Sequence, residues 1–209
     1  MIVQAQHKKF TADQYYQMAE SGILTQRDRV ELIEGEIIQM AAIGKNHAVC
    51  VDRLTELFVL AFSSQALIRV QNPVRLSNYS EPQPDFAILR LRQDFYLDGH
   101  PQPEDVLAVV EVSDSSIDQR SAAGSAVRRR STADYDRGVK APLYAGEGIQ
   151  ELWIIDLNVL AVEVYRLPSS QGYQQVQTFQ RGESVAFQAF PNVSFQVEQL
   201  LIPMLGNHA

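Results

Sequence analysis

The pattern of apolar and polar residues predicts two helices in the first third of the 209-residue chain. The first covers residues 11–20, where Thr11 stands in the position of an N-cap. The second covers 46–65, where apolar residues recur at helical spacing from Val49 onward and Asn46 stands in the capping position. Beyond this second segment the spacing of apolar residues shortens to that of strands.

Most of the remaining pattern predicts short strands. One of them, 106–112, is apolar on both faces, which is typical of a strand in the middle of a sheet. Other segments are joined by turn residues and predict antiparallel hairpins. The predicted hairpins are 29–40 around Glu34-Gly35, 151–157 with 161–167 around Asn158, and 173–179 with 184–187 around Arg181-Gly182-Glu183; the further strands are 67–76 with a break at Pro73 and 84–89, and 195–201 closes as a short helical turn.

A carboxylate interrupts the apolar strand 106–112. Burying an unpaired charge costs several kcal/mol, so Glu111 needs a partner. Successive side chains of a strand point to opposite faces. The face of Glu111 is expected to carry Leu107, Val109 and Ser113, and the other face Val106, Ala108, Val110 and Val112. Asp85 stands at the start of the strand 84–89, so antiparallel pairing of the two strands would bring the two carboxylates together.

Two neighbouring carboxylates repel each other, and a hard divalent cation between them removes the repulsion. Mg²⁺ or Mn²⁺ is the expected ion, because Mg²⁺ in proteins is bound through one or two carboxylates with water and substrate phosphate. Such a site also uses a lysine for electrostatic help. Of the four lysines, only Lys140 follows both strands.

Lys140 lies in a predicted helix, 135–149, which Gly138 and Pro142 are expected to weaken or kink. Arg137, Lys140 and Tyr144 are spaced i, i+3 and i+7, so the helix would place them on one side. The preceding segment, 119–134, is rich in Ser, Ala, Gly and Arg and has no apolar period. We interpret 119–134 as a mobile surface insertion in a single domain of residues 1–209.

Composition narrows the class of protein. The net charge of −7 argues against a protein that coats nucleic acid non-specifically, but not against an enzyme that brings cations to its substrate. Cys50 is the only cysteine, so neither an intrachain disulfide nor a cysteine zinc site is expected. No apolar run is long enough for a membrane span, and MIVQAQHKKF lacks the apolar region of a signal peptide, so we expect a cytoplasmic protein.

In sequence order, the motifs resemble the Uma-type family of restriction endonucleases within the PD-(D/E)XK nuclease superfamily. The matching pieces cover nearly the whole chain: VELIEGEI, Asn46-His47, QPDFAIL, VVEVSDSS and DRGVKAPLYAGEGIQELWIIDL. The resemblance implies that Asp85, Glu111 and the carbonyl of Val112 hold the metal. The lysine expected directly after the glutamate motif is replaced by Ser113, and the resemblance implies that Lys140 on the following helix takes its role. Members of the family usually pass almost directly from SDSS into that helix, so 119–134 is a departure.

Each of these residues also has a structural interpretation. Asp85 could cap a turn, Glu111 could pair with Arg75, and Lys140 could be a solvated helix residue. Three further residues are possible auxiliaries: Glu34 of the acidic hairpin, His47 at the start of its helix, and Tyr144. A solvated position is an equally good interpretation for Glu34, and a simple first-turn residue a slightly better one for His47.

The sequence therefore predicts an α/β domain with a restriction-endonuclease-like mixed central sheet, flanked by helices and extended by antiparallel hairpins. The resemblance implies Mg²⁺-dependent hydrolysis of phosphodiester bonds in DNA, with no organic cofactor. A homodimer is plausible because cutting both strands favours two-fold symmetry. The alternative is a non-catalytic protein-interaction module on the same fold, which would bind no divalent ion. A third possibility is a nuclease that acts on RNA or on branched DNA.

Overall fold

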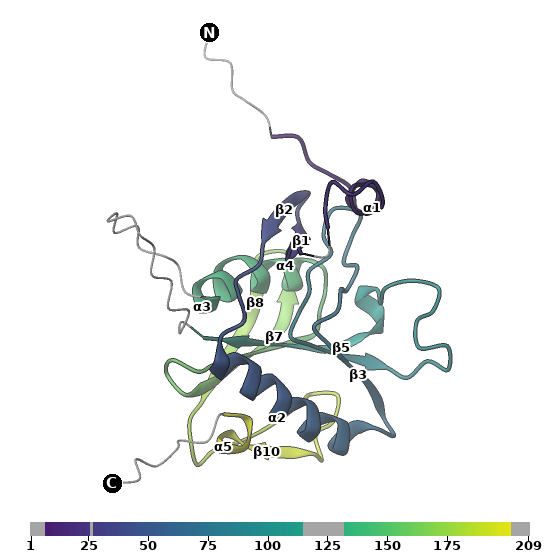
Figure 1. Ribbon diagram of the computed structural model, residues 1–209. Helices are drawn as coiled ribbons and strands as arrows, with labels where there is room; N and C mark the ends of the chain where they lie inside the picture. Colours follow the sequence, from purple (N-terminus) through teal and green to yellow (C-terminus); the bar gives the residue numbers. More distant parts are fainter. Residues whose placement is uncertain (1–6, 26, 115–131, 202–209) are drawn as a thin grey trace, which may run out of the picture.

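The computed structural model describes residues 7–25, 27–114 and 132–201. Its centre is a six-stranded sheet in the order β3-β4-β5-β6-β7-β8 (Figure 1). The strands are β3 Ala66–Val70, β4 Phe86–Arg90, β5 Val106–Ser113, β6 Glu151–Asp156, β7 Ala161–Ser169 and β8 Gly172–Phe179. Only β5 and β6 run parallel, and the other neighbours are antiparallel, so the predicted mixed α/β sheet is confirmed.

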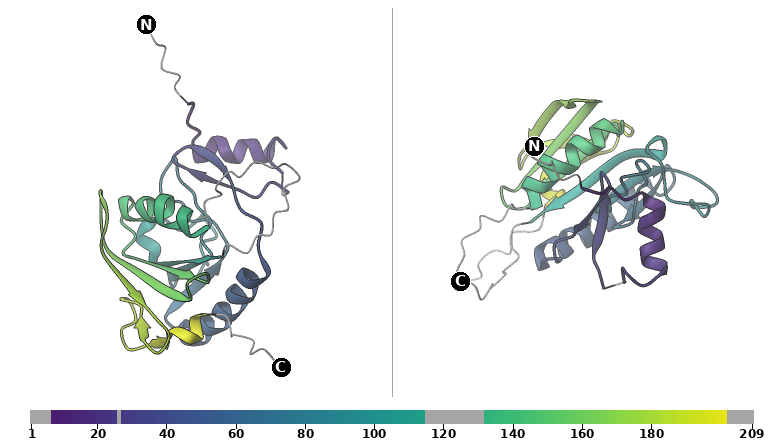
Figure 2. Two further views of the ribbon diagram at one scale, coloured as in Figure 1. Left: turned by 90° about the vertical axis from the view of Figure 1, so that its left-hand side faces the viewer. Right: turned by 90° about the horizontal axis from the view of Figure 1, so that it is seen from above.

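The strand β5 lies in the interior of the sheet and is buried along almost its whole length. Its apolar residues explain this position, because a strand covered on both faces needs apolar side chains on both. The helix α2, Lys45–Phe62, covers one face of the sheet together with α5, Val197–Leu200. The helix α4, Ala141–Gly146, covers the other face. Figure 2 shows the sheet between the green helical segment and the blue helix.

Two smaller elements complete the layers. The helix α1, Ala12–Glu20, begins with the N-cap expected at Thr11, whose side chain accepts from the Gln14 backbone N–H. The Gln14 side chain accepts in turn from the Thr11 backbone N–H, which completes a capping box. The hairpin of β1, Val30–Ile33, and β2, Glu36–Gln39, turns at Glu34-Gly35, where both residues have positive φ. Both predictions are confirmed.

The start of α2 differs from the prediction. Gly44 is the N-cap, and Asn46 lies inside the helix without capping it. Val49 is 44% exposed, so it does not belong to the buried face. The buried face consists of Cys50, Val51, Leu54, Phe58 and Phe62. Val49 lies beside this face rather than on it, so the packing of α2 on the sheet leaves it exposed.

The predicted face assignment of β5 holds at its C-terminal end and fails at its start. Ala108, Val110 and Val112 pack on the α2 side, whereas Val109 packs on the α4 side. A register shift between Ile88 and Leu89 of β4 disturbs the ladder near Val106, which therefore packs on the α4 side instead. The partly buried Leu107 packs on the α2 side for the same reason.

The predicted hairpin of 173–179 with 184–187 is wrong. The strand β8 pairs with β7, while β9, Ser184–Ala186, pairs with β10, Ser194–Gln196, in a separate ribbon. The side chains of Val185, Phe187 and Phe195 join the core on the α2 side, and this burial draws the ribbon away from β8. The helical turn expected over 195–201 is present as α5.

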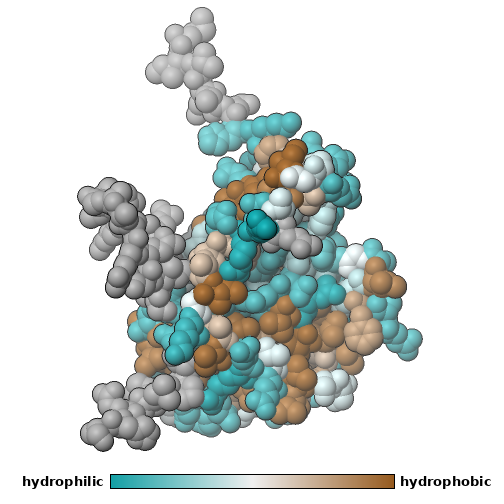
Figure 3. All heavy atoms as spheres, in the orientation of Figure 1, coloured by the Kyte–Doolittle hydropathy of each residue, from teal (hydrophilic) through white to brown (hydrophobic). Residues whose placement is uncertain are grey.

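Part of the predicted insertion, residues 119–131, lies outside the described residues. Its last three residues are helical with Tyr135, forming α3, Thr132–Tyr135, so the helical region starts earlier than expected. No helix within the described ranges is long and apolar enough to cross a membrane. On the face drawn in Figure 3, hydrophobic residues form several patches with hydrophilic side chains between them.

Candidate active site

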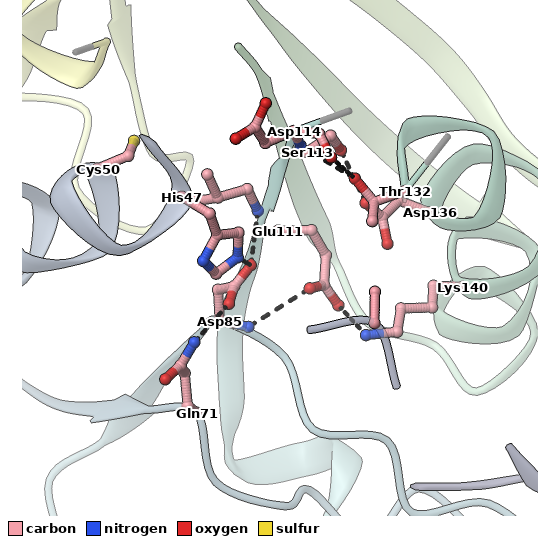
Figure 4. Close-up of polar contacts among 12 residues, drawn as sticks. His47, Cys50, Gln71, Asp85, Glu111, Ser113, Asp114, Thr132, Asp136 and Lys140 are labelled. Carbon is pink, nitrogen blue, oxygen red and sulfur yellow. Dashed lines mark hydrogen bonds and ion pairs between the residues drawn. The ribbon is translucent and has the colours of Figure 1, made fainter. Parts of the chain in front are cut away.

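The pairing of β4 with β5 brings the two predicted carboxylates to one place. Phe86 pairs with Val110 in the antiparallel ladder, so Asp85, one residue earlier, comes opposite Glu111. The backbone N–H of Asp85 lies 3.4 Å from Oε2 of Glu111. Figure 4 shows the Asp85 carboxylate turned toward His47 and the Glu111 carboxylate turned toward Lys140.

The Asp85 carboxylate is fixed by three donors. Its Oδ2 accepts from the backbone N–H of Val112 at 2.8 Å and lies 3.1 Å from Nε2 of His47. Its Oδ1 accepts from the Gln71 side chain at 3.1 Å. Burial alone would raise the pKa of Asp85, but hydrogen bonds and the charge of His47 outweigh it, and the pKa is lowered. Asp85 is therefore held ionised.

His47 and Gln71 both belong to the site because their side chains contact the Asp85 carboxylate. Burial opposes the charged form of His47, yet the adjacent Asp85 raises the His47 pKa. Gln71 has a φ of 48° and donates its backbone N–H to the Asp85 carbonyl, which sets its side chain beside the carboxylate. The structural interpretation of His47 as a simple first-turn residue does not describe this contact. Gln71 was not predicted, because a glutamine after a strand carries no distinctive pattern.

Glu111 is only 3% exposed and is paired from the α4 side. Its Oε1 lies 3.1 Å from Nζ of Lys140 and accepts from the Tyr144 hydroxyl at 2.8 Å. Arg75 pairs instead with Glu81 at 2.8 Å. The partner of the buried glutamate is therefore Lys140, and neither the arginine pair nor a solvated lysine describes the structure.

An irregular helix delivers Lys140 to the sheet. Residues Asp136–Lys140 form a π-helical segment, in which the N–H of Ala141 bonds to the carbonyl of Asp136, five residues back. Pro142 follows and has no N–H to donate, which is consistent with the kink expected from it. The segment was predicted as one regular helix, and the structure interrupts it with this π turn.

Arg137 ties the same helical segment to the neighbouring strands. Its guanidinium contacts Asp156 of β6 at 2.5 Å and Glu163 of β7 at 2.7 Å. Ile154 stands between Glu111 and Glu163 in the strand register, so both carboxylates point to the same face of the sheet. Arg137, Lys140 and Tyr144 thus all contact one face, as their spacing predicted.

Lys140 is surrounded by more negative charge than it can neutralise. Its Nζ also lies 3.4 Å from Oε2 of Glu31, and Asp136 contributes further negative charge. Burial raises the pKa of Glu111 to about 8, against the lowering effect of Lys140, and raises that of Asp136 to about 6. Burial disfavours the charged ammonium, but Glu111, Glu31 and Asp136 outweigh it and raise the Lys140 pKa well above its ordinary value. Lys140 therefore stays protonated, and the neighbouring carboxyl groups oppose one another's ionisation.

The acidic β1–β2 hairpin contributes Glu31 to the site, although Glu31 was not predicted as a site residue. Glu31 is 2% exposed and accepts from Tyr135 at 3.1 Å and from the backbone N–H of Gln83 at 3.1 Å. Glu34 lies at the tip of the hairpin, is exposed, and does not line the cavity of the site. The turn residue Glu34 is exposed, whereas the strand residue Glu31 contacts Lys140.

Residues that follow Glu111 also form hydrogen bonds to the helical segment that carries Lys140. Ser113, which stands where the resemblance expects a lysine, donates its hydroxyl to Asp136 at 2.7 Å. Asp114 donates its backbone N–H to Thr132 at 2.9 Å. Asp136 was missed because its role depends on the π turn. Ser115 and Ser116 lie outside the described residues.

His47, Gln71, Lys140 and the carboxylates of the site line one cavity of about 490 Å³, within the usual range for a ligand site. In the described part of the chain, its carboxylates outnumber its lysines and arginines, which are Arg29 and Lys140. Its carboxylates are Glu31, Asp85, Glu111, Asp114 and Asp136. Such an excess of buried carboxyl groups suits a cation, which would favour their ionised forms.

The donor set fits a lightly held hard ion. Within the described ranges, no group of three or more His, Cys, Asp and Glu side chains is arranged to hold a metal. Asp85 and Glu111 nevertheless each keep an oxygen with spare lone pairs, because Oδ1 of Asp85 accepts one hydrogen bond and Oε2 of Glu111 only a long one. Two carboxylates completed by a carbonyl and water are a usual set for Mg²⁺.

The mixed sheet, with a cavity of carboxylates and a lysine beside its middle strands, defines an α/β protein of nuclease-like fold. Residues 12–122 and 127–198 match the model of the Uma2 family, described as "Putative restriction endonuclease". The chain belongs to this family, and the resemblance noted in the sequence is confirmed.

A solved structure shows the same fold. It is the crystal structure of a protein described as a "putative nuclease belonging to DUF820" from Anabaena variabilis ATCC 29413. The TM-score is 0.65 at 16% sequence identity, and the alignment covers 91% of this chain and 97% of that chain. No curated protein matches the chain.

Proposed function

We propose that this protein is a metal-dependent endonuclease that hydrolyses phosphodiester bonds in DNA. The observation that carries the proposal is the convergence of Asp85, Glu111 and Lys140 at one cavity, from two adjacent strands and a helix packed on them. Membership of the Uma2 family supports the nuclease class. The choice of DNA and of Mg²⁺ or Mn²⁺ is part of the proposal.

Asp85, Glu111 and the backbone carbonyl of Val112 would hold the ion. When bound, a divalent ion polarises a phosphodiester and favours ionisation of a neighbouring water. The hydrogen bonds from His47, Gln71 and the Val112 N–H keep the Asp85 carboxylate ionised and fixed in orientation. Carboxylates held in this way lose little entropy on binding a cation.

Lys140 acts as a fixed positive charge rather than as a base. Its pKa is raised well above its ordinary value, because its carboxylate neighbours outweigh the effect of burial. Glu111 and Glu31 hold the ammonium at 3.1 and 3.4 Å, so it can donate to the attacking water or to the phosphate without reorganising. The Tyr144 hydroxyl, with its pKa raised by burial, stays protonated as a donor to Glu111.

A cleavage assay tests the proposal. Supercoiled plasmid with Mg²⁺ or Mn²⁺ should be nicked or linearised by the wild type, and chelation should stop the reaction. Asp85→Asn, Glu111→Gln and Lys140→Ala should each lower the rate by roughly 100-fold or more. The matched control is Lys45→Ala, which removes an exposed lysine from the start of α2 and should leave the rate unchanged. Cleavage that survives both carboxylate substitutions would overturn the assignment of the site.

The rival function is a non-catalytic interaction module on the same fold. It is favoured by the lack, among the described residues, of a third acidic or histidine side chain arranged as a metal ligand. Such a module would show no cleavage of any nucleic acid and no divalent-ion binding. Homodimerisation remains a prediction that sedimentation of the intact chain would test.

A further inference from the structure

The two edges of the central sheet differ in their exposure. The strand β3 forms one edge, contains no exposed residue and carries the charged Arg69. The strand β8 forms the other edge, and five consecutive residues of it, 174–178, are exposed, so both of its faces are open to solvent there. In the left view of Figure 2, the yellow-green hairpin of β7 and β8 lies at the margin of the molecule.

The strand β8 lacks the features that usually protect the edge of a sheet. An edge strand presents N–H and carbonyl groups with which another strand can pair, and charged side chains, proline or a short length usually prevent this pairing. The strand β8 is eight residues long, and its sequence, GYQQVQTF, contains neither a charged residue nor proline. From Gln175 to Phe179 it pairs with β7 without a break, so this part is regular enough to accept a further strand.

The charged residues of the neighbouring strand β7 are neutralised within the chain. Glu163 is paired with Arg137 at 2.7 Å, and Arg166 is paired with Glu151 at 2.6 Å. Each copy of the chain carries a net charge of −7, which opposes association in general. A second copy that approaches β8 nevertheless meets an uncharged strand beside neutralised charges, so repulsion is weak at this edge.

The exposed part of β8 is chemically symmetric about Val176. Gln175 and Gln177 flank it, and the next residues outward, Gln174 and Thr178, are also polar and uncharged. When two antiparallel copies of a strand are related by a two-fold axis at a central residue, each residue faces its mirror position. Val176 would face Val176 of the second copy. Gln175 would face Gln177, and Gln174 would face Thr178, so apolar meets apolar and polar meets polar. Matched cross-strand pairs of this kind stabilise a sheet.

We propose that β8 pairs antiparallel with β8 of a second copy of this chain, with the two-fold axis at Val176. The six strands of each copy then form one continuous sheet across the interface. The residues that line the cavity of the candidate site do not include β8, so the pairing leaves both cavities open. The inference depends on the edge of the sheet alone and stands or falls independently of the nuclease function.

Sedimentation velocity of the intact chain tests the pairing. We expect the wild type to form dimers at micromolar concentrations. Val176→Lys places two ammonium groups opposite each other at the axis and should raise the dissociation constant of the dimer by about tenfold or more. The matched control is Leu97→Lys, because Leu97 is 89% exposed on the loop after β4 and the substitution adds the same charge away from β8.

Leu97→Lys should form dimers like the wild type. A wild type that stays monomeric throughout the micromolar range would overturn the inference. So would dimers that Val176→Lys leaves intact, or dimers that Val176→Lys and Leu97→Lys weaken equally.

Disulfide cross-linking tests the register of the pairing. In Val176→Cys, the two new thiols lie opposite each other at the axis, and mild oxidation should produce a covalent dimer. In Thr178→Cys, the two thiols lie four positions apart along the strands, about 13 Å, which is too far for a disulfide. Cys50 is fully buried, so the wild type should give no cross-link. Cross-linking of Thr178→Cys as fast as Val176→Cys, or none in Val176→Cys, would overturn the inference.

Discussion

The Nζ atom of Lys140 lies 3.1 Å from Oε1 of Glu111, and both side chains are almost completely buried. The two residues are separated by 29 positions and meet because a π-helical turn packs on the middle of the sheet. A buried pair of this kind is costly to desolvate and stabilises only when its geometry is good. Its presence beside Asp85 is the central feature of the candidate site.

Removing the ammonium should destabilise the fold. Lys140→Met leaves Glu111, Glu31 and Asp136 without a counter-charge, and the free energy of unfolding is expected to fall by about 3–5 kcal/mol at pH 8. Urea denaturation measures this loss. The loss should be smaller at pH 5, where Glu111 and Asp136 are protonated, and smaller in the double variant Lys140→Met with Glu111→Gln. A loss that is the same at both pH values would contradict the buried-charge explanation.

The stability of the ion-free protein should depend on pH through Glu111. Its pKa is about 8 in the folded protein, against 4.5 for an ordinary glutamate. Between these values the folded state keeps a proton that the unfolded state releases, so stability falls as pH rises from about 5 to 8. The slope from this group is at most about 1.4 kcal/mol per pH unit. Asp136, with a pKa of about 6, adds to the slope at the acidic end.

Thermal unfolding in a chelator, from pH 5 to pH 8, checks the sign of this dependence. Glu111→Gln carries no titrating carboxyl and should show a much flatter profile. Stability that rises with pH in the wild type, or an undiminished slope in Glu111→Gln, would refute the raised pKa.

The attachment of the π-helical segment to the sheet should depend on the shape of the Arg137 side chain. Its guanidinium contacts both Asp156 and Glu163, which a lysine ammonium cannot do in the same planar geometry. Arg137→Lys is expected to cost about 1–2 kcal/mol of stability and to lower cleavage, because Lys140 is displaced. Arg166→Lys, which alters the Glu151 pair distant from the cavity, should lower stability without lowering cleavage by the folded protein.

Substitution of His47 should weaken cation binding without unfolding the protein. His47 contacts Asp85 at 3.1 Å from the start of α2, and partners of this kind tune metal affinity by about 10–100-fold. His47→Ala is therefore expected to raise the dissociation constant for Mn²⁺ by about tenfold, measured by calorimetry. His100→Ala, on the loop before β5, is the matched control and should bind Mn²⁺ like the wild type.

The sequence was most informative where local patterns act alone. Thr11 and the period of α1 fixed that helix, and the apolar run around Glu111 predicted the middle strand. The opposition of Asp85 and Glu111 followed from strand alternation and antiparallel pairing. The helix and the strand depend on neighbouring residues in the chain, which a single sequence displays, and the opposition of the two carboxylates follows once the two strands pair.

Features that depend on tertiary packing were not predicted. Glu31 reaches Lys140 through the tertiary packing of the hairpin, and the alternation within the hairpin could not reveal this contact. Asp136 enters the site because the helix contains a π turn, and Gln71 because a positive φ follows β3. The pairing of β9 with β10 was missed because aromatic burial on the α2 side overrode the nearer turn signal.

Calorimetric titration of the ion-free protein with Mg²⁺ or Mn²⁺ tests the central claim most directly. The account predicts binding by the wild type that is lost in Asp85→Ala and in Glu111→Ala. Glu34→Ala, which removes an exposed carboxylate from the hairpin tip, should bind like the wild type. No binding by the wild type, or binding that persists in both Asp85→Ala and Glu111→Ala, would contradict the claim that these two acids form a cation site.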